Sequence, residues 1–314
     1  MIKIFHSVDG KMHETKKITK KTWIKLSSPS VDEIHKVISY LNLGRDNIMA
    51  TIIDPEEKTR IEIMDTHTLI LIDIPTLEKH HQRESYRTIP LIIILTHQNV
   101  VTICSEETPI LDYFHDSPIG QFSMRGELHF VYQIMLRTSF FYQQALTAID
   151  KKRTEFEEHI EKITDEVDLI NLHELESSLV YFATSLRGNN SVFNRLARSN
   201  QLNQFQADKE LLDDILIENQ QAIEMAQIYR DILDGTRELM ATIINSRLNH
   251  VMKRLTSITM ILSIPMVISG MYGMNVDSQW VPFANTTHGF GMIGLITAAI
   301  CFILMVFLKN KKML

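Results

Sequence analysis

The chain has 314 residues, 45% of them hydrophobic, and carries a formal net charge of −6 at pH 7. This mild acidity, without a basic stripe to neutralise phosphates, excludes a nucleic-acid-binding platform. The mean hydropathy of −0.03 is what a soluble portion of about 250 residues joined to a very apolar tail produces.

Residues 1–120 have the mixed pattern of a cytosolic α/β domain. Runs of β-branched and apolar residues predict a sheet with at least one strand buried on both faces. The polar stretch 78–87, which contains His80 and His81, is predicted to be a surface loop rather than a metal site. The expected strands cover residues 2–5, 22–26, 60–64, 69–74, 90–95 and 100–104.

One helix is expected inside this domain. Ser30 is the predicted cap residue, and Asp32 and Glu33 supply the early acidic side chains that favour a helix start. The helix is expected to run to about Leu43, where Gly44 ends it.

The segment 121–207 is predicted to be helical and strongly charged. Apolar residues at helical spacing predict helices over 127–163, 165–186 and 192–200. The Gly-Asn-Asn sequence at 188–190 is predicted to break the second helix from the third. Long charged helices that follow an α/β domain give an α+β fold class.

A final, continuous stalk helix is predicted over residues 208–272, because no proline interrupts it before Pro265. Its length to that proline is on the order of 85 Å at 1.5 Å per residue. Apolar positions repeat at a spacing of three or four, which marks a seam that is either buried within the chain or lies between copies of it. The seam positions are Ala222, Met225, Tyr229, Ile232, Thr236, Leu239 and Ile243.

The end of the chain is predicted to be a membrane hairpin. Two apolar segments, at about 253–272 and 289–308, each match the roughly 20 residues that cross the hydrocarbon core of a bilayer. The loop between them, residues 273–288, is too short to be a domain, and a basic tail, residues 309–314, follows the second segment.

The positions of the basic residues predict the orientation of this hairpin. Lys253 and Arg254 precede the first segment, and three lysines follow the second, whereas the loop at 276–288 contains neither Lys nor Arg. Because positive residues accumulate on the cytoplasmic side, both termini are expected in the cytoplasm of a cell membrane protein. The first residues lack the long apolar core of a signal peptide, which agrees with a cytosolic N-terminal part.

One face of the first membrane segment carries small, weakly polar and methionine side chains. Such a stripe usually marks helix–helix packing. The alternative is that it lines a pore. The spacing alone favours packing. The stripe consists of Met252, Thr256, Thr259, Ser263, Met266 and Gly270.

The sequence Tyr272-Gly273-Met274-Asn275 follows this segment, and a short loop, a second span and a lysine-rich end come after it. This layout resembles the CorA family of divalent-cation channels. The resemblance extends to the α/β domain, the charged helices and the stalk, and therefore covers essentially the whole chain.

The resemblance implies a homopentamer in the bilayer, in which the first membrane helix of each copy lines a central pore. It places Gly273, Met274 and Asn275 at the outer mouth as the selectivity filter. A pore-facing asparagine before the membrane, a hydrophobic constriction and further pore positions are also implied. These pore or gate residues are Asn249, Met252, Leu255, Thr259, Ser263 and Met266.

The resemblance also implies that Mg²⁺ is both the transported ion and a regulatory ligand, with no organic cofactor. Regulatory carboxylates on the stalk helix match Asp213, Asp214 and Glu238. Asp73 is the expected partner carboxylate in the N-terminal domain of a neighbouring copy. High internal Mg²⁺ would bridge carboxylates between copies and hold the channel closed.

Two features depart from the family pattern. The acidic loop that commonly follows Gly-Met-Asn is absent, and Asp277 is the only acid between residues 276 and 283. Ser263 stands where a second methionine often narrows the pore, with Met266 one turn later.

The sequence therefore predicts an influx channel for Mg²⁺, with Co²⁺ or Ni²⁺ as further ions, driven by the membrane potential. The alternatives are a zinc transporter of the ZntB-like branch and a membrane-anchored scaffold or sensor. An enzyme is not expected, because the chain has no Gly-rich phosphate loop and no nucleophile motif. Cys104 and Cys301 form neither a metal-binding nor a disulfide pattern.

Overall fold

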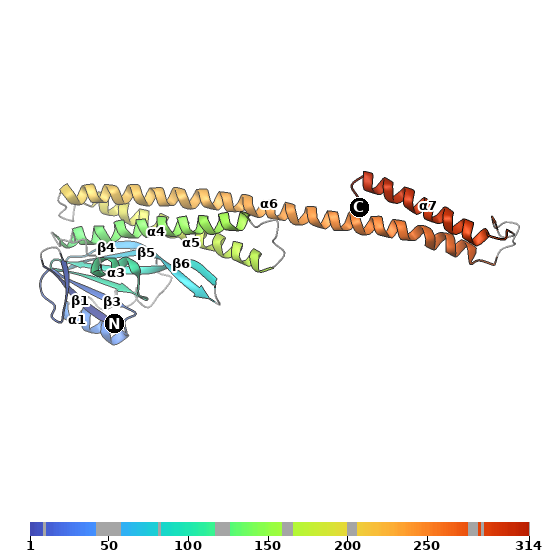
Figure 1. The fold of residues 1–314 in the computed structure, drawn as a ribbon. Helices are drawn as coiled ribbons and strands as arrows, with labels where there is room; N and C mark the ends of the chain where they lie inside the picture. The colour runs from blue at the N-terminus through green and yellow to red at the C-terminus, as the bar shows by residue number, and fades with distance from the viewer. Residues whose placement is uncertain are drawn as a thin grey trace. The chain divides into compact units, whose positions relative to one another are not determined.

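A computed structural model describes residues 1–8, 11–41, 58–80, 83–116, 126–158, 166–199, 206–275, 282–283 and 286–313. The chain divides into two compact units, Met1–Thr236 and Arg237–Leu314. The predicted α+β class, with an N-terminal α/β part, long helices and two apolar C-terminal helices, is confirmed (Figure 1).

The first unit is built on one seven-stranded sheet with the strand order β2-β1-β3-β7-β6-β5-β4. Neighbouring strands are antiparallel except for β3 and β7, which are parallel. Every residue of β7 is buried, as its run of apolar residues predicts. Every residue of β3 is buried as well, although its sequence alternates, and its buried Lys25 pairs with Asp112. The strands are β1 (Ile2–Val8), β2 (Lys11–Thr15), β3 (Thr22–Ser27), β4 (Arg60–Ile63), β5 (His67–His80), β6 (Arg83–Thr96) and β7 (Asn99–Cys104).

The predicted loop at 78–87 is wrong, because β5 continues to His80 and β6 begins at Arg83. Cross-strand pairs stabilise this polar end of the hairpin. The Arg87 guanidinium lies 3.4 Å from the Glu78 carboxylate on the paired strand. The Tyr86 ring packs edge-on against Phe182, which lies on a helix and not on a strand. Strand β2 was not predicted from the sequence at all.

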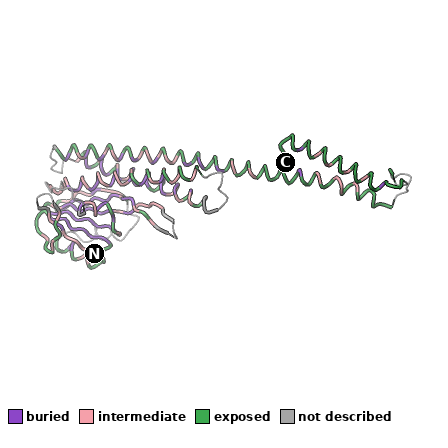
Figure 2. The backbone as a smooth tube through the Cα atoms, viewed as in Figure 1, coloured by how far each residue is buried: buried purple, intermediate pink, exposed green. Residues whose placement is uncertain are grey.

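Helices cover both faces of the sheet. Helix α1 (Val31–Tyr40) begins at Ser30 with a capping box to Glu33, as predicted, and buries Ile34, Val37 and Ile38 on one face. The predicted end at Gly44 lies outside the described residues. The other face is covered by α3 (Pro109–Asp116), which was not predicted, by α4 (Glu127–Glu158) and by α5 (Glu166–Arg198) (Figures 1 and 2).

The predicted helix break at 188–190 is also wrong, because α5 runs through it without interruption. The Asn189 side-chain amide accepts a hydrogen bond from Asp73 N–H and donates one to Asp73 C=O, each at 2.8 Å. A β-carbon at Gly188 would lie 2.5 Å from Thr59 Oγ1. Gly188 and Asn189 therefore dock the helix on the edge of the sheet, and tertiary contacts outweigh their low helix propensity.

Helix α6 (Gln206–Tyr272) has 67 residues and is about 100 Å long at 1.5 Å per residue. In the first unit it packs on α4 and α5, since Gln143 donates to Glu218 C=O and Asn219 donates to Leu186 C=O. The positions of its apolar seam are not all in the same environment. Ala222 and Thr236 are buried within the chain, whereas Ile232 and Leu239 are exposed.

Candidate functional site

Among the residues that the structure describes, two helices are long and apolar enough to cross a membrane, the apolar part of α6 and α7 (Gly289–Asn310). In the most apolar window of each, only 6% of the residues are buried inside the chain. An exposed apolar surface of this extent marks a surface that contacts a membrane or another protein chain. Length, composition and exposure together identify a membrane-spanning hairpin in the second unit.

Helix α6 presents one narrow stripe to α7. Ser257 is buried and Ile261, Ile264 and Ile268 are partly buried, at steps of four, three and four residues. The Ser257 hydroxyl donates a hydrogen bond to the carbonyl of Met313, just beyond the end of α7. The carbonyl of Ile261 accepts a hydrogen bond from the Cys301 thiol of α7.

The polar and methionine stripe predicted from the sequence lies on the other side of α6. At 100° per residue the two stripes are about 150° apart. Every member is exposed in the single chain, so none is used for packing against α7. We call this set the exposed stripe: Met252, Thr256, Thr259, Ser263, Met266 and Gly270.

Two hydroxyl groups of the exposed stripe are oriented by their own helix. Thr259 Oγ1 donates to Leu255 C=O at 2.8 Å, and Ser263 Oγ donates to Met260 C=O at 2.9 Å. Because each hydroxyl proton is used in the helix, the oxygen lone pairs remain as acceptors. Such oxygens can accept hydrogen bonds from the water molecules around a hydrated cation. The flanking predicted positions Asn249 and Leu255 are exposed as well.

Helix α6 continues through Pro265, and α7 compensates for the hydrogen bond that this proline lacks. Pro265 has no N–H to donate to the carbonyl of Ile261, four residues earlier. The Cys301 thiol of α7 donates to that carbonyl at 3.7 Å. In a membrane, a backbone carbonyl freed by proline must find a partner of this kind.

The Tyr-Gly-Met-Asn sequence lies at the end of α6. Gly273 N–H still bonds to Ser269 C=O at 2.9 Å, and Met274 and Asn275 beyond it are exposed. The Tyr272 hydroxyl donates to Pro282 C=O at 2.6 Å, which ties the helix end to the returning loop. A β-carbon at Gly273 would make only ordinary contacts, at 3.4 Å or more. The chain by itself therefore does not require glycine at this position. Asp277 lies outside the described residues.

The predicted regulatory carboxylates have different environments. Asp213, Asp214 and Glu238 are exposed on α6 and are free to face another copy. The carboxyl of Asp73 is partly buried between the sheet and the helices, where it interacts with Ser185, and burial raises its pKa. Asp73 therefore differs from the three exposed carboxylates in its surroundings, and its part in a site shared between copies stays a prediction. Among the described residues no group of three or more His, Cys, Asp or Glu side chains could hold a metal ion.

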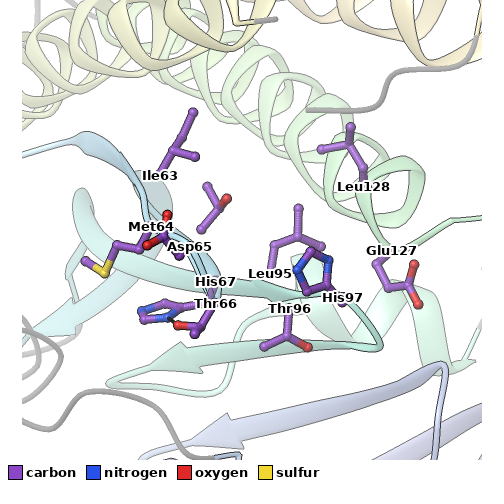
Figure 3. A pocket seen from close by; sticks show the side chains of 11 residues that line it. Ile63, Met64, Asp65, Thr66, His67, Leu95, Thr96, His97, Glu127 and Leu128 are labelled. Atoms are coloured by element: carbon purple, nitrogen blue, oxygen red, sulfur yellow. Dashed lines mark hydrogen bonds between the residues drawn. The ribbon is translucent and has the colours of Figure 1, made fainter. Parts of the chain in front are cut away.

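A cavity of about 400 Å³ lies where β5 begins and β6 ends, next to the start of α4 (Figure 3). Its lining includes His67, His97, Asp65 and Glu127. Burial lowers the pKa of His67, so its imidazole is neutral at neutral pH. Within this lining the Thr66 hydroxyl lies 2.9 Å from His67 Nδ1, so the two neighbouring side chains are hydrogen-bonded to each other.

The sequence reasoning missed two residues that organise these regions. Asn189 belongs to the predicted helix break, and the sequence pattern assigns Cys301 neither a metal-binding nor a disulfide role. A proline inside a membrane helix does signal a carbonyl without a partner, but the sequence does not reveal which residue of the second helix lies opposite it.

The chain is similar in sequence to known proteins. The family model described as CorA-like Mg²⁺ transporter protein matches residues 20–312. The cobalt/magnesium transport protein CorA of Methanocaldococcus jannaschii is 27% identical over 290 residues, which are 91% of this chain and 88% of that protein.

Solved structures show the same fold. The complete structure of the CorA magnesium transporter from M. jannaschii matches with a TM-score of 0.81 at 22% identity, covering 98% of this chain and 96% of that one. The ZntB cytoplasmic domain from Vibrio parahaemolyticus matches with a TM-score of 0.52 at 11% identity, covering 75% of this chain and 97% of that one.

Proposed function

Because the chain belongs to the CorA-like Mg²⁺ transporter family, whose model matches residues 20–312, we propose that it conducts Mg²⁺ across a membrane. The observation that carries the proposal is the exposed stripe, which faces away from α7 and whose last member, Gly270, lies three residues before Gly273-Met274-Asn275. Five copies around an axis would enclose this stripe as the wall of an aqueous pore.

The outer mouth is proposed to recognise a hydrated ion. Mg²⁺ releases its six waters reluctantly and binds few protein ligands directly. A ring of Asn275 amide oxygens and Gly273 carbonyls would accept hydrogen bonds from those waters. Carboxylates at this position would bind more tightly and slow the release of the ion, whereas conduction needs weak sites. Close approach of the copies here would also explain a glycine that the single chain does not require.

The cytosolic end of the stripe is proposed to be the gate. Met252 and Leu255 are 52% and 57% exposed in the single chain, so five copies could place both in rings around the axis. A narrow apolar ring excludes water, and a charged ion does not cross a dry constriction. When the ring is wide, a membrane potential of 100 mV, negative inside, favours entry of a divalent ion by about 4.6 kcal/mol.

Regulation is proposed to depend on the exposed carboxylates of Asp213 and Asp214. Between copies these groups repel one another unless a divalent cation lies between them. High internal Mg²⁺ would hold the copies together and the gate closed, and Glu238 lower on α6 would add to this effect. Co²⁺ and Ni²⁺ are further proposed cargo ions.

The proposed orientation has both termini in the cytoplasm and the loop after α6 outside. Lys253 and Arg254 precede the membrane part of α6, and Lys309 follows that of α7. This distribution supports a cytosolic location for the first unit.

The test is Mg²⁺ uptake into proteoliposomes under an imposed potential, with Asn275→Ala compared with Asn310→Ala as a matched control. We expect Asn275→Ala to abolish uptake and to leave the oligomer intact by light scattering, and the control to conduct normally. Retained uptake in Asn275→Ala would show that the mouth is not built by this residue. A solution mass other than a pentamer would contradict the pore.

The zinc alternative is tested in the same vesicles. The match to the ZntB cytoplasmic domain shows a shared fold only, and the family match favours Mg²⁺. Uptake of Zn²⁺ that depends on a pH gradient and exceeds Mg²⁺ uptake would favour the zinc branch. Pentamers that pass no ion would favour the scaffold alternative.

A further inference from the structure

Ser257 is buried, unlike its neighbours on the membrane part of α6. It is 0% exposed, whereas residues 251–256 and 258–260 on both sides of it are exposed. Its hydroxyl donates to the main-chain carbonyl of Met313, beyond the end of α7, at 3.0 Å. A serine hydroxyl buried in this position has found a specific acceptor 56 residues away in the sequence.

The acceptor is held by a defined helix-capping motif. Lys312 N–H bonds to Lys309 C=O at 3.1 Å, and Met313 N–H bonds to Leu308 C=O at 3.0 Å. Lys312 has a φ of 54°. This pair of bonds around a left-handed residue is a Schellman motif, in which an apolar contact between the third helical residue from the end and the second residue after the cap is typical. Leu308, at the first of these positions, is only 2% exposed.

The motif determines where the Met313 carbonyl points. Because the cap reverses the chain direction in a single turn, residues 311–313 fold back instead of continuing along the axis of α7. The carbonyl then meets the one buried polar side chain on the facing stripe of α6. In apolar surroundings a carbonyl and a hydroxyl without partners are both costly, so the contact is favoured.

This contact lies at the level of the proposed gate. Ser257 and Leu255 are two residues apart and project about 160° from one another around the helix. Met252 lies five residues before Ser257, about 1.4 turns of the helix. A restraint on the Ser257 side of α6 therefore limits how far this turn of the helix can rotate or tilt, and with it the ring that Met252 and Leu255 would form.

We propose that Ser257 and the cap at Leu308, Lys309, Lys312 and Met313 form a capping latch, which positions the gate turn of α6 by tying it to the end of α7. Ser257 is a positioning residue and does not touch the ion. The inference rests on the proposed channel function. When the latch is broken, the gate turn of α6 is less restrained and the width of the Met252 and Leu255 rings varies more. The open, water-filled state of the pore is then more populated at any internal Mg²⁺ concentration.

Two matched pairs of variants test the latch in the full chain. Ser257→Ala removes the donor, whereas Ser257→Thr keeps a hydroxyl. Lys312→Pro cannot adopt a positive φ and removes an N–H of the cap, whereas Lys312→Gly adopts it freely. The second pair removes the same lysine charge in both variants, so a difference between them reports the cap and not the electrostatics.

Two independent readouts are needed. Hydrogen–deuterium exchange of the amides of Lys311 and Met313 in nanodiscs reports the latch whether or not the protein conducts; position 312 is left out because its proline variant has no amide N–H. Mg²⁺ flux at increasing internal Mg²⁺ in proteoliposomes reports the gate. For Ser257→Ala and Lys312→Pro we expect faster exchange, and an increase of about threefold in the internal Mg²⁺ that halves the flux, the size expected for one membrane hydrogen bond. Ser257→Thr and Lys312→Gly should remain close to the wild type in both.

The outcomes separate the latch from the channel. Unchanged exchange in Ser257→Ala overturns the latch, and wild-type Mg²⁺ flux in the same vesicles leaves the proposed function standing. Faster exchange with an unmoved inhibition curve overturns the coupling of the latch to the gate. A wild type that passes no Mg²⁺, although the amides are protected and Ser257→Ala exposes them, overturns the channel and not the contact. If Ser257→Ala fails to assemble, the Lys312 pair decides.

Discussion

The thiol of Cys301 lies 3.7 Å from the carbonyl oxygen of Ile261, on the facing helix of the hairpin. Pro265 deprives this carbonyl of its helical donor, so a side chain of α7 supplies the hydrogen that the backbone of α6 cannot. The proline is thereby accommodated without ending the helix, and α6 remains continuous to Tyr272.

The first prediction concerns this contact. Cys301→Ala should destabilise the hairpin by about 0.6 kcal/mol, the average for a polar contact between membrane helices. Cys301→Ser, which retains a donor of similar size, should be as stable as the wild type or more so. Thermal unfolding in detergent, compared at equal protein concentration, measures the difference. Equal melting temperatures for the Ala and Ser variants would show that the thiol contributes nothing as a donor.

The second prediction concerns the docking of α5 on the sheet. Asn189→Ala removes two hydrogen bonds to the main chain of Asp73, one from its N–H and one to its carbonyl. The carbonyl still accepts a hydrogen bond from the Tyr142 hydroxyl at 3.1 Å. We expect a loss of about 2–4 kcal/mol in the free energy of unfolding. Asn190→Ala is the control, because it makes the same chemical change at the next, less buried position. Chemical denaturation of the two variants should separate them clearly, and similar losses would contradict the docking role.

The third prediction is a pH dependence. Burial raises the pKa of Asp73 above its ordinary value of 3.8. The fold therefore favours the protonated form, and the wild type loses stability as the pH rises through the folded-state pKa. Asp73→Asn stays neutral and should be more stable than the wild type at pH 7, with an advantage that shrinks as the pH falls toward 3.8. Asp65→Asn makes the same chemical change at an exposed position and is the control. Melting temperatures across this range provide the test, and a constant difference for Asp73→Asn would refute it.

The fourth prediction concerns regulation. Asp214→Ala should remove a ligand of the bridging cation, so that internal Mg²⁺ no longer closes the channel at the wild-type concentration. The control is Asp234→Ala, an exposed carboxylate further along α6. Flux at graded internal Mg²⁺ measures the effect. Full inhibition of Asp214→Ala at the wild-type concentration would remove this residue from the regulatory site.

Much of the architecture could be read from local patterns. Apolar β-branched runs located the central strands, and Ser30 with Glu33 located a helix start, because burial and capping depend on neighbours in the sequence. The length of the last two helices and the family layout around Gly273-Met274-Asn275 likewise required no tertiary information. The failures at 78–87 and 188–190 have a common cause. Polar residues there are partnered across strands or between helix and sheet, and intrinsic propensity does not contain those partners.

The amino-acid order alone determined the membrane hairpin, the α+β class and the stripe of small and methionine side chains, since each depends on composition and spacing along one element. Only the tertiary structure decided that this stripe faces away from α7, that Asp73 is engaged inside its own chain, and that Ser257 meets Met313. These relationships join residues far apart in sequence, and they depend on how the elements pack rather than on any local preference.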